Sequence, residues 1–366
     1  MPRGCGTLAP VKDLLAQLVQ GQPLSSEQAV HAFEQIMSGK SEPTQTAALL
    51  AMIQQRGATV DELVGAATVM RNKAAKVAVP QGLTAIDTCG TGGDHAGTFN
   101  ISTAAAIVAA GAGRPMGLCV AKHGNKSVTS KSGSSQVLDT LGVKLAVDTD
   151  TLTRCLDQAG ICFCFAPAHH PAMKHAGPVR ADLGFRTIFN IVGPLTNPAG
   201  APRQVMGVFA PGLTEKIANV LLQLGSIHAM VVHGQMPDND GDGAHQGGID
   251  ELSTCGPSRV STIRDGKVKT SELDPTDLQL SLGHPSALRV DGPEQSAKVI
   301  TEILAGKGGA PREIVALNAG AALVVGGVAD SLAEGLAMAF DAIDSGKAKA
   351  ALDGLIELTN AAPASA

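Results

Sequence analysis

The sequence predicts an α/β fold with a small all-helical domain and a larger α/β domain built on a mostly parallel central sheet. Two observations predict it. Helix signals without any strand pattern occupy the amino-terminal part, whereas from Leu83 onward apolar strands, glycine turns and helices alternate. The chain has 366 residues and 44% hydrophobic content, enough for two domains with their own cores.

Composition excludes several classes of protein. The formal net charge of −5 contains no long basic run, and the aromatic content of 2% includes no Trp or Tyr, which argues against a nucleic-acid binder. No apolar stretch is long enough for a signal peptide or a membrane span. The seven cysteines are an odd number without a disulfide framework. We therefore expect a soluble cytoplasmic protein that binds neither membranes nor nucleic acid.

The helical domain is expected over residues 1–78. Residues 11–18 are amphipathic, a capping box at 25–28 opens a helix over 29–37, Pro43 opens another that runs to residue 55, and 59–62 is a second capping box. The segment 170–197 interrupts the later alternation, with short helices near 172–174 and from Pro178. We expect this segment to join the helical domain.

The α/β domain is then expected over residues 79–169 and 198–366. Its predicted parallel strands cover 83–88, 118–121, 161–165, 205–209 and 228–233. A hairpin is predicted from 259–263 and 267–270 around Asp265-Gly266, followed by helices to about residue 358. Because ligands of open α/β sheets bind at the carboxyl ends of the strands, the loops after these strands are the expected site. Cys162 and Cys164 alternate, so they should share one side of a buried strand rather than bind a metal.

A glycine-rich stretch at residues 87–94 follows the first expected strand. Gly90, Gly92 and Gly93 permit positive φ and leave backbone N–H groups open to an anion. Hydroxyl groups then gather at the amino end of the alanine-rich run 104–110, where the helix dipole favours negative charge; these are Thr98, Ser102 and Thr103. A phosphate cradle or a plain strand-to-helix turn would both fit this stretch alone.

Two further loops carry charge. The loop 120–133 is rich in cationic, amide and hydroxyl groups, namely Lys122, Asn125, Lys126, Ser127, Ser130 and Lys131. It fits a phosphorylated ligand, although a solvated basic loop is the alternative. The adjacent carboxylates of Asp250 and Glu251 suit Mg²⁺ beside substrate phosphates, with solvated surface as the alternative. The acidic stretch 238–243 lacks a calcium-loop glutamate because Ile249 stands at the twelfth position, so it is interpreted as a flexible insertion.

The segment 169–180 contains three histidines and an arginine. His170 and His175 are five positions apart, which no helical face collects, so zinc is disfavoured. Arg180 is a candidate for a bidentate grip on a carboxylate, with a salt bridge as the alternative.

Together these stretches resemble the anthranilate phosphoribosyltransferase family, the tryptophan-pathway branch of the nucleoside phosphorylase type II fold. The resemblance spans nearly the whole chain. The motifs that carry it, in family order, are Gly90-Thr-Gly-Gly-Asp94, Asn100-Ile-Ser-Thr103, Lys122-His-Gly-Asn125, His170-Pro-Ala-Met173, Thr187-Ile-Phe-Asn-Ile-Val-Gly-Pro-Leu-Thr-Asn-Pro198 and Asp250-Glu-Leu-Ser253.

The resemblance implies transfer of the phosphoribosyl group from phosphoribosyl pyrophosphate to the amine of anthranilate, with release of pyrophosphate, by a homodimer that uses Mg²⁺ at two sites. It implies donor contacts from Gly90, Gly93, Asp94, Thr98, Asn100, Ile101, Ser102, Thr103, Lys122, Gly124, Asn125, Ser130 and Ser134. It implies anthranilate contacts from Gly90, His123, Asn125, Arg180, Gly193 and Pro194, and magnesium ligands at Ser102, Asp250 and Glu251. His123 is the nearest candidate for a general base, a weak one because the attacking amine loses its proton late.

Three departures from the family pattern and two alternatives remain. Lys126 stands where the family usually has Arg, the spacer 113–120 is long, and 235–246 is an insertion before the carboxylates. A pyrimidine nucleoside phosphorylase shares the fold but has no need for the carboxylate pair or for Arg180. A non-catalytic nucleic-acid binder of this fold would need a basic groove, which the net charge argues against.

Overall fold

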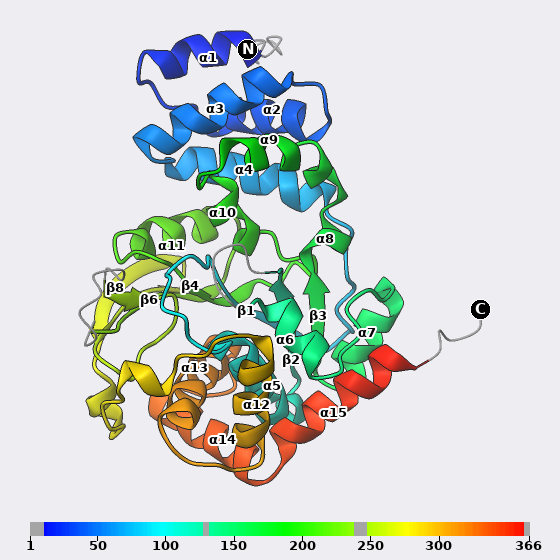
Figure 1. Ribbon diagram of the computed structural model, residues 1–366, viewed down its shortest axis with the longest axis vertical. Helices are drawn as coiled ribbons and strands as arrows, with labels where there is room; N and C mark the ends of the chain where they lie inside the picture. The colour runs from blue at the N-terminus through cyan, green and yellow to red at the C-terminus, as the bar shows by residue number, and fades with distance from the viewer. Residues whose placement is uncertain (1–10, 127–131, 238–246, 362–366) are drawn as a thin grey trace. The chain divides into compact units, whose positions relative to one another are not determined.

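The computed structural model describes residues 11–126, 132–237 and 247–361. Contacts divide the chain into two compact units (Figure 1). The helical unit comprises Met1–Ala75 and His170–Thr196, and the α/β unit comprises Lys76–His169 and Asn197–Ala366. No helix within the described ranges is long and apolar enough to cross a membrane.

The helical unit is built from α1 (Val11–Val19), α2 (Ser26–Met37), α3 (Pro43–Arg56) and α4 (Val60–Lys73), with α9 (Gly177–Leu183) and α10 (Phe189–Val192) from the later segment. Both predicted capping boxes are confirmed, with Ser25 capping α2 and Thr59 capping α4. The helix expected near 172–174 is instead a 3₁₀ turn at Pro171–Lys174. The segment has only 4 residues, and 3₁₀ geometry is typical of such short helical pieces. A second 3₁₀ turn covers Gly193–Leu195.

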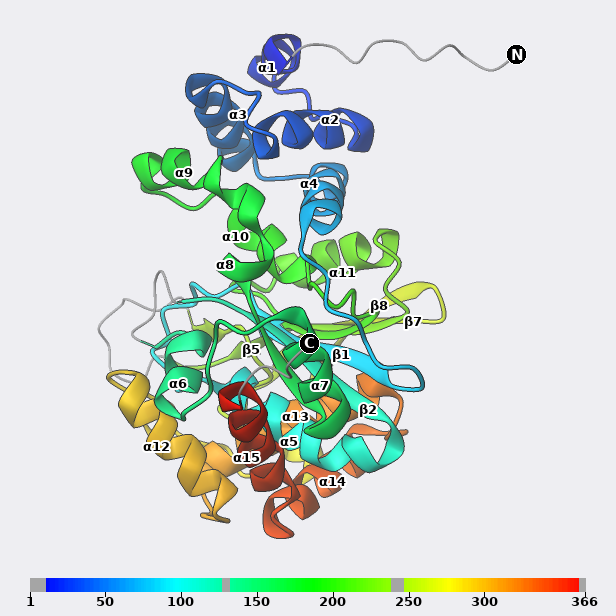
Figure 2. The same cartoon turned by 90° about the vertical axis from the view of Figure 1, so that its right-hand side faces the viewer.

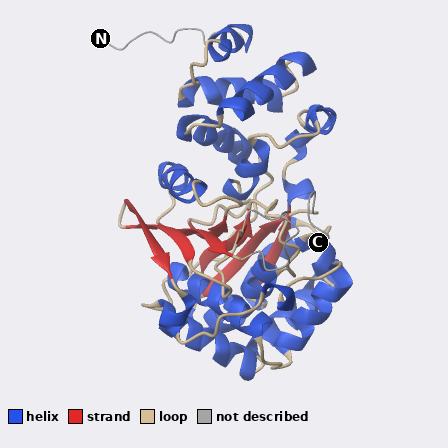
Figure 3. Ribbon diagram, turned by 60° about the vertical axis from the view of Figure 1, so that its left-hand side comes forward, coloured by secondary structure: helices blue, strands red, loops and turns tan. Residues whose placement is uncertain are grey.

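The α/β unit is organised by one sheet, whose strands are drawn in red in Figure 3. The strand order is β3-β2-β1-β4-β5-β7-β8, with β6 paired to β5. The strands β1 to β5 pair in parallel, and β6, β7 and β8 pair antiparallel. Their bounds are β1 (Thr84–Gly90), β2 (Leu118–Gly124), β3 (Ile161–Phe165), β4 (Arg203–Gly207), β5 (His228–Gln235), β6 (Gly248–Ile249), β7 (Ser258–Arg264) and β8 (Lys267–Leu273). The mostly parallel sheet is thus confirmed.

The strand order reverses at β1. The chain proceeds from β1 to β2 and β3 on one side, then returns to place β4 and β5 on the other. Such a reversal opens a crevice at the carboxyl ends of the two strands that flank it, here β1 and β4. The fold therefore concentrates the expected site at the end of these two strands.

Two strand ends differ from the prediction. β1 continues to Gly90 instead of ending at residue 88, and β4 ends at Gly207 instead of residue 209. The cause is the residue-by-residue pairing of the two strands, which runs from Ile86 with Arg203 to Gly90 with Gly207. The predicted hairpin is confirmed, since Asp265 (φ 52°) and Gly266 (φ 71°) form the turn between β7 and β8.

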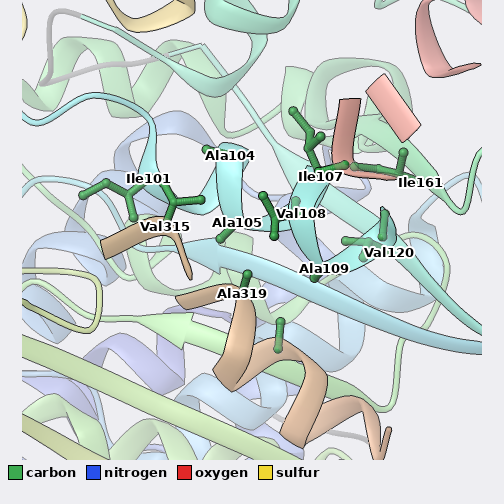
Figure 4. Close-up of a cluster of buried hydrophobic side chains, with 14 of the residues drawn as sticks. Ile101, Ala104, Ala105, Ile107, Val108, Ala109, Val120, Ile161, Val315 and Ala319 are labelled. Atoms are coloured by element: carbon green, nitrogen blue, oxygen red, sulfur yellow. The ribbon is translucent and has the colours of Figure 1, made fainter. Parts of the chain in front are cut away.

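Helices cover both faces of the sheet. The core of the unit is formed by α5 (Ile101–Gly113) and α13 (Ala310–Gly326), which pack against each other and against β1 (Figures 2 and 4). Small residues allow the close packing, and Ala104, Ala105 and Ala319 lie within this core. The other helices are α6 (Ser134–Thr140), α7 (Thr149–Gln158), α8 (Ala166–His169), α11 (Leu213–Gln223), α12 (Pro293–Leu304), α14 (Leu332–Asp344) and α15 (Lys347–Asn360).

Two local predictions concern this core. The helix expected from residue 104 begins three residues earlier at Ile101, which places Ser102 in its first turn. Cys162 and Cys164 are buried with their sulfur atoms 3.8 Å apart, so the prediction that they share one side of a strand is confirmed.

Candidate active site

Gly90 and Gly207 pair at the ends of β1 and β4. They make room for the segment 250–253, which carries Asp250 and Glu251 and is called the carboxylate loop below. A Cβ at Gly90 would lie 2.9 Å from the Asp250 carboxyl carbon, and one at Gly207 would overlap the Asp250 carbonyl. Gly90 has no positive φ, so the prediction that it supplies an unusual backbone conformation is wrong. That prediction is confirmed for Gly92 (φ 64°) and Gly93 (φ 79°). Gly90 instead permits a close approach of Asp250.

The glycine-rich turn is joined to the carboxylate loop by hydrogen bonds. The N–H of Gly92 donates to Asp250 Oδ2 at 2.7 Å, and the N–H of Asp250 donates to Asp94 Oδ2 at 3.3 Å. Asp94 also accepts the Ala96 N–H at 3.2 Å, which closes its own loop. The glycine-rich turn therefore binds the Asp250 carboxylate and places the Asp94 carboxylate next to it.

The amino end of α5 holds the other carboxylate. Glu251 Oε1 accepts the N–H of Ser102 at 3.1 Å, where the helix dipole favours a negative charge. Thr103, buried in the same turn, has a hydroxyl group without a hydrogen-bond partner in the described part of the chain. Hydroxyl and carboxylate groups thus converge at this helix end.

Lys122 places a buried cation next to these groups. It lies on β2 with 2% of its surface exposed, and its Nζ donates to the Thr88 carbonyl at 2.5 Å and to Ser102 Oγ at 3.3 Å. On the next residue, the N–H of His123 donates to Oδ1 of the buried Asp87 at 3.0 Å, and burial raises the pKa of Asp87. The end of β2 is thereby fixed against β1.

The carboxylates of the site have raised pKa values. Burial, together with the charges of Asp94 and Glu251, raises the pKa of Asp250 well above its ordinary range. Burial also raises the pKa of Glu251 from 4.5 to about 7, although Lys122 and the Ser102 N–H oppose the shift. Excess negative charge at this point would be relieved by a cation.

The predicted donor residues after β2 occupy different environments. Asn125 is exposed, and its carbonyl accepts the hydroxyl of Ser134, the first residue of α6, at 3.2 Å. Gly124 ends β2 where a Cβ would meet that hydroxyl and the Phe163 ring. Ser127, Ser130 and Lys131 lie outside the described residues.

Asn100 binds neighbouring protein groups. Its Oδ1 accepts the hydroxyl groups of Ser132 at 2.6 Å and Ser296 at 2.8 Å, and its Nδ2 donates to the Ser132 carbonyl at 3.1 Å. Thr98 pairs with Arg289 in an isolated bridge, and Ile101 is buried at the start of α5. Asn100 therefore joins three segments that surround the expected donor site.

Arg180 belongs to the helical unit. It lies on α9 with its guanidinium carbon 5.4 Å from the centre of the Phe189 ring, and burial lowers its pKa. No carboxylate lies within ion-pair distance of Arg180 in the described ranges. Gly193 and Pro194 form the 3₁₀ turn of the same unit. Arg180 thus presents a guanidinium group that stacks on Phe189 and has no counter-ion among the residues that the structure describes.

The histidines near Arg180 take up structural positions. Thr196 Oγ1 lies 3.5 Å from His170 Nε2, and the His175 ring fills the space where Gly39 would carry a Cβ. Within residues 11–126, 132–237 and 247–361, no three His, Cys, Asp or Glu side chains are arranged to hold a metal ion on their own.

Family models match both parts of the chain. The model described as glycosyl transferase family, helical bundle domain, matches residues 12–74, and the one described as glycosyl transferase family, a/b domain, matches residues 82–349. An anthranilate phosphoribosyltransferase from Methylorubrum extorquens is 47% identical over 96% of this chain and 99% of its own length. One from Azorhizobium caulinodans is 46% identical over 96% and 97%. The chain belongs to the anthranilate phosphoribosyltransferase family.

Solved structures of the anthranilate phosphoribosyltransferase family have the same fold. The enzyme from Thermus thermophilus matches with a TM-score of 0.85 and 37% identity over 95% of this chain and 100% of its own. The enzyme from Saccharomyces cerevisiae, solved in complex with phosphoribosyl pyrophosphate and Mg, matches with a TM-score of 0.82 and 27% identity over 95% and 97%.

Some residues that position this candidate site are not indicated by the sequence motifs. Asp87 fixes the end of β2, Gly207 admits the carboxylate loop, and the Asn197 side chain donates to the Ala121 carbonyl at 2.7 Å. Asn318, buried in α13, binds the backbone of Leu252. A glycine inside a strand and an amide inside an apolar helix were the available signals for Gly207 and Asn318.

Proposed function

We propose that the protein transfers the phosphoribosyl group of phosphoribosyl pyrophosphate to the amine of anthranilate, giving N-(5-phosphoribosyl)anthranilate and pyrophosphate in tryptophan biosynthesis. Family membership supports this reaction. The observation that carries it is the carboxylate loop, whose Asp250 is bound by Gly92 and whose Glu251 is bound by Ser102 at the switch point of the sheet. An Mg²⁺-dependent phosphoribosyl donor would bind at such a place.

Magnesium would be held by Ser102, Asp250 and Glu251 at two sites. The donor set fits, because the carboxylates of Asp250 and Glu251 lie beside each other and near Asp94, and burial and this crowding raise the pKa of Asp250. The absence of a three-residue cage in the described ranges also fits, since Mg²⁺ commonly combines one or two carboxylates with waters and substrate phosphates. When bound, the metal would neutralise charge on the departing pyrophosphate.

The donor would be held by groups that surround the end of β1. We assign this role to Gly90, Gly93, Asp94, Thr98, Asn100, Ile101, Ser102, Thr103, Lys122, Gly124, Asn125, Ser130 and Ser134. Lys122 contributes a fixed positive charge, since two oxygen atoms already orient its ammonium group. Asn100 contributes mainly shape, because its amide binds Ser132 and Ser296.

The acceptor carboxylate would be bound by Arg180. A planar guanidinium with no ion-pair partner in the described ranges suits bidentate binding of a benzoate, and stacking on Phe189 restrains its plane. Gly90, His123, Asn125, Gly193 and Pro194 would contribute the remaining contacts. Positioning of the amine matters more than a strong base, because the ribosyl carbon becomes cationic before the amine loses its proton. His123 is the base we would examine first.

We further propose that the protein is a cytoplasmic homodimer. The resemblance to the family supports the dimer. None of the cysteines that the structure describes forms a disulfide, which fits a reducing compartment.

The proposed reaction is tested by mixing the protein with anthranilate and phosphoribosyl pyrophosphate and following anthranilate fluorescence. We expect a decay that requires Mg²⁺ and stops when the metal is chelated. A decay that is absent, or that persists without Mg²⁺, would disprove the proposal.

The role of Arg180 is tested by Arg180→Ala. We expect the KM for anthranilate to rise at least ~10-fold, with little change in the KM for the donor, because a charge-assisted hydrogen-bonded pair contributes about 1.5–3 kcal/mol. Steady-state kinetics with each substrate varied in turn measures both constants.

Arg312 offers a matched control for Arg180. It also stacks on an aromatic ring, with its guanidinium carbon 5.1 Å from the centre of Phe340, but it is already paired with Asp344 at 2.7 Å. Arg312→Ala should leave both KM values near those of the wild type. Equal changes in the two KM values of Arg180→Ala would rule out its role in carboxylate binding.

A further inference from the structure

Asn318 is a polar side chain in an otherwise apolar stretch of α13. The run Ile314–Gly326 is buried throughout, and Asn318 is its one residue with a polar side chain. Only 2% of its surface is exposed. Asparagine is a mediocre helix former, and an amide is costly to bury unless it is fully hydrogen-bonded. A residue that violates two local preferences at once requires a compensating role.

The Asn318 amide binds both backbone groups of a single residue, Leu252. Its Oδ1 accepts the Leu252 N–H at 3.0 Å, and its Nδ2 donates to the Leu252 carbonyl at 2.9 Å and to the Ile314 carbonyl at 2.9 Å. The orientation of the amide is determined by its partners, since a flipped amide would place a donor against the Leu252 N–H. Asn318 therefore fixes the peptide plane on each side of Leu252.

Leu252 directly follows the two carboxylates. On the other side of them, Ile249 ends β6 and pairs with Gly234 on β5. Asp250 and Glu251 thus lie between two backbone anchors, one provided by the sheet and the other by α13. The Leu252 side chain is fully buried, so the second anchor is also a packing contact.

We propose that Asn318 is a positioning residue for magnesium binding, which holds the backbone after Glu251 so that the two carboxylates keep the spacing that the metal requires. This inference rests on the proposed function, because it assumes that Asp250 and Glu251 are the metal ligands. Hydrogen bonds from Gly92 and Ser102 orient the two carboxylates. The hydrogen bonds of Asn318 fix the position of the backbone at Leu252, the residue that follows them.

Two substitutions of graded severity test the inference. Asn318→Asp keeps the shape and an acceptor but has no N–H group, and it offers at most one O–H donor when it is protonated. Asn318→Leu keeps the branched shape and improves the helix propensity, but it removes the whole amide. Binding of Mg²⁺ is measured by titration calorimetry with and without phosphoribosyl pyrophosphate, thermal unfolding reports folding, and steady-state kinetics gives kcat and the KM for anthranilate.

Ser258→Ala is the matched control. Ser258 is buried in β7, and its hydroxyl accepts the N–H of Ser253, one residue beyond Leu252. The control therefore removes a buried acceptor from the same loop without releasing Leu252.

We expect Mg²⁺ affinity to fall at least tenfold in Asn318→Leu and by a smaller factor in Asn318→Asp, with kcat reduced and the KM for anthranilate unchanged. Ser258→Ala should bind Mg²⁺ within twofold of the wild type. Unchanged Mg²⁺ affinity in a folded Asn318→Asp protein would overturn the inference, as would an equal loss in Ser258→Ala. Failure of the proposed function is a separate result, since the wild type itself would then lack Mg²⁺-dependent turnover.

Discussion

Glu62 in the helical unit and Glu251 in the α/β unit are both glutamates removed from bulk water, but their carboxylates have opposite electrostatic surroundings. The Glu62 side chain is fully buried, whereas Glu251 is only partly buried. Burial by itself would raise the pKa of both carboxylates. Their pKa values nevertheless shift in opposite directions, since the pKa of Glu62 is lowered and that of Glu251 is raised to about 7.

The surroundings of Glu62 compensate for its burial. Its carboxylate accepts bonds from the Arg56 guanidinium at 2.5 and 2.6 Å, from the Leu24 N–H at 3.0 Å and from the Thr59 N–H at 2.9 Å. These donors outweigh the desolvation that would otherwise raise its pKa. Glu62 thus links the segment before α2 to the end of α3 and the start of α4.

The surroundings of Glu251 do not compensate in this way. It accepts the Ser102 N–H and feels the charge of Lys122, but Asp94 and Asp250 add negative charge nearby. Both glutamates are subject to desolvation, so what distinguishes the structural Glu62 from the proposed magnesium ligand Glu251 is whether the protein supplies enough hydrogen-bond donors and positive charge to compensate. Crowded carboxylates without full compensation commonly mark functional sites.

The comparison predicts that Glu251→Gln separates activity from stability. We expect turnover to fall by about 100- to 1000-fold, the range seen when an electrostatic contact to a transition state is lost. The free energy of unfolding in the absence of Mg²⁺ should stay constant or rise by about 1 kcal/mol, because repulsion from Asp94 and Asp250 is relieved. Fluorescence-monitored kinetics and urea unfolding measure the two effects. A parallel loss of activity and stability would contradict the comparison.

Glu62→Gln should have the opposite effect. We expect the free energy of unfolding to fall by about 3 kcal/mol, because Arg56 loses its counter-ion in a largely buried pair. The kcat of the protein that remains folded should stay close to that of the wild type.

Glu34 offers a matched control for Glu62 within the same unit. Its pair with Lys73, at 2.6 Å, is partly exposed, with 47% of the Glu34 side chain accessible. Glu34→Gln should cost less than about 1 kcal/mol, as is usual for surface ion pairs. Urea unfolding measures the free energy of unfolding of both variants. Equal decreases in Glu62→Gln and Glu34→Gln would show that burial of the ion pair does not affect its contribution to stability.

The sequence predicted what depends on local pattern. The capping boxes at Ser25 and Thr59 and the hairpin turn at Asp265 follow from residue types within a few positions of each other, and the structure confirms them. The parallel sheet follows from the alternation of strands and helices. The carboxylate pair and the glycine turn were identified as parts of one site, and the structure brings Asp250 to Gly92.

The sequence did not reveal contacts between distant segments. Asn318 lies 66 positions from Leu252 along the chain, so the local sequence around either residue does not predict the hydrogen bonds between them. The local sequence predicts a turn at Gly90, because glycine is common in turns. The structure shows that Gly90 instead leaves space for Asp250, a residue far along the chain. Periodicity describes which face of an element is buried, but not which backbone crosses that face.

The raised pKa of Glu251 also predicts a pH dependence of stability in the absence of Mg²⁺. The pKa of Glu251 is about 7 in the folded protein and 4.5 as its ordinary value, so between these pH values the folded state keeps a proton that the unfolded state has lost. The stability contributed by this proton is present below pH 4.5 and is lost as the pH rises through 7. We expect the loss to reach about 2 kcal/mol, less than the full shift implies because Glu251 is partly exposed.

Comparison with Glu251→Gln isolates this contribution, because Asp87 and Asp250 also have raised pKa values and remain in both proteins. The free energy of unfolding, measured by urea titration from pH 5 to pH 8, should fall more steeply in the wild type than in the variant. Adding Mg²⁺ should reduce this difference, since a bound cation stabilises the same carboxylate that the proton neutralises. Parallel pH profiles for the two proteins would mean that Lys122 and Ser102 compensate Glu251 as fully as Arg56 compensates Glu62.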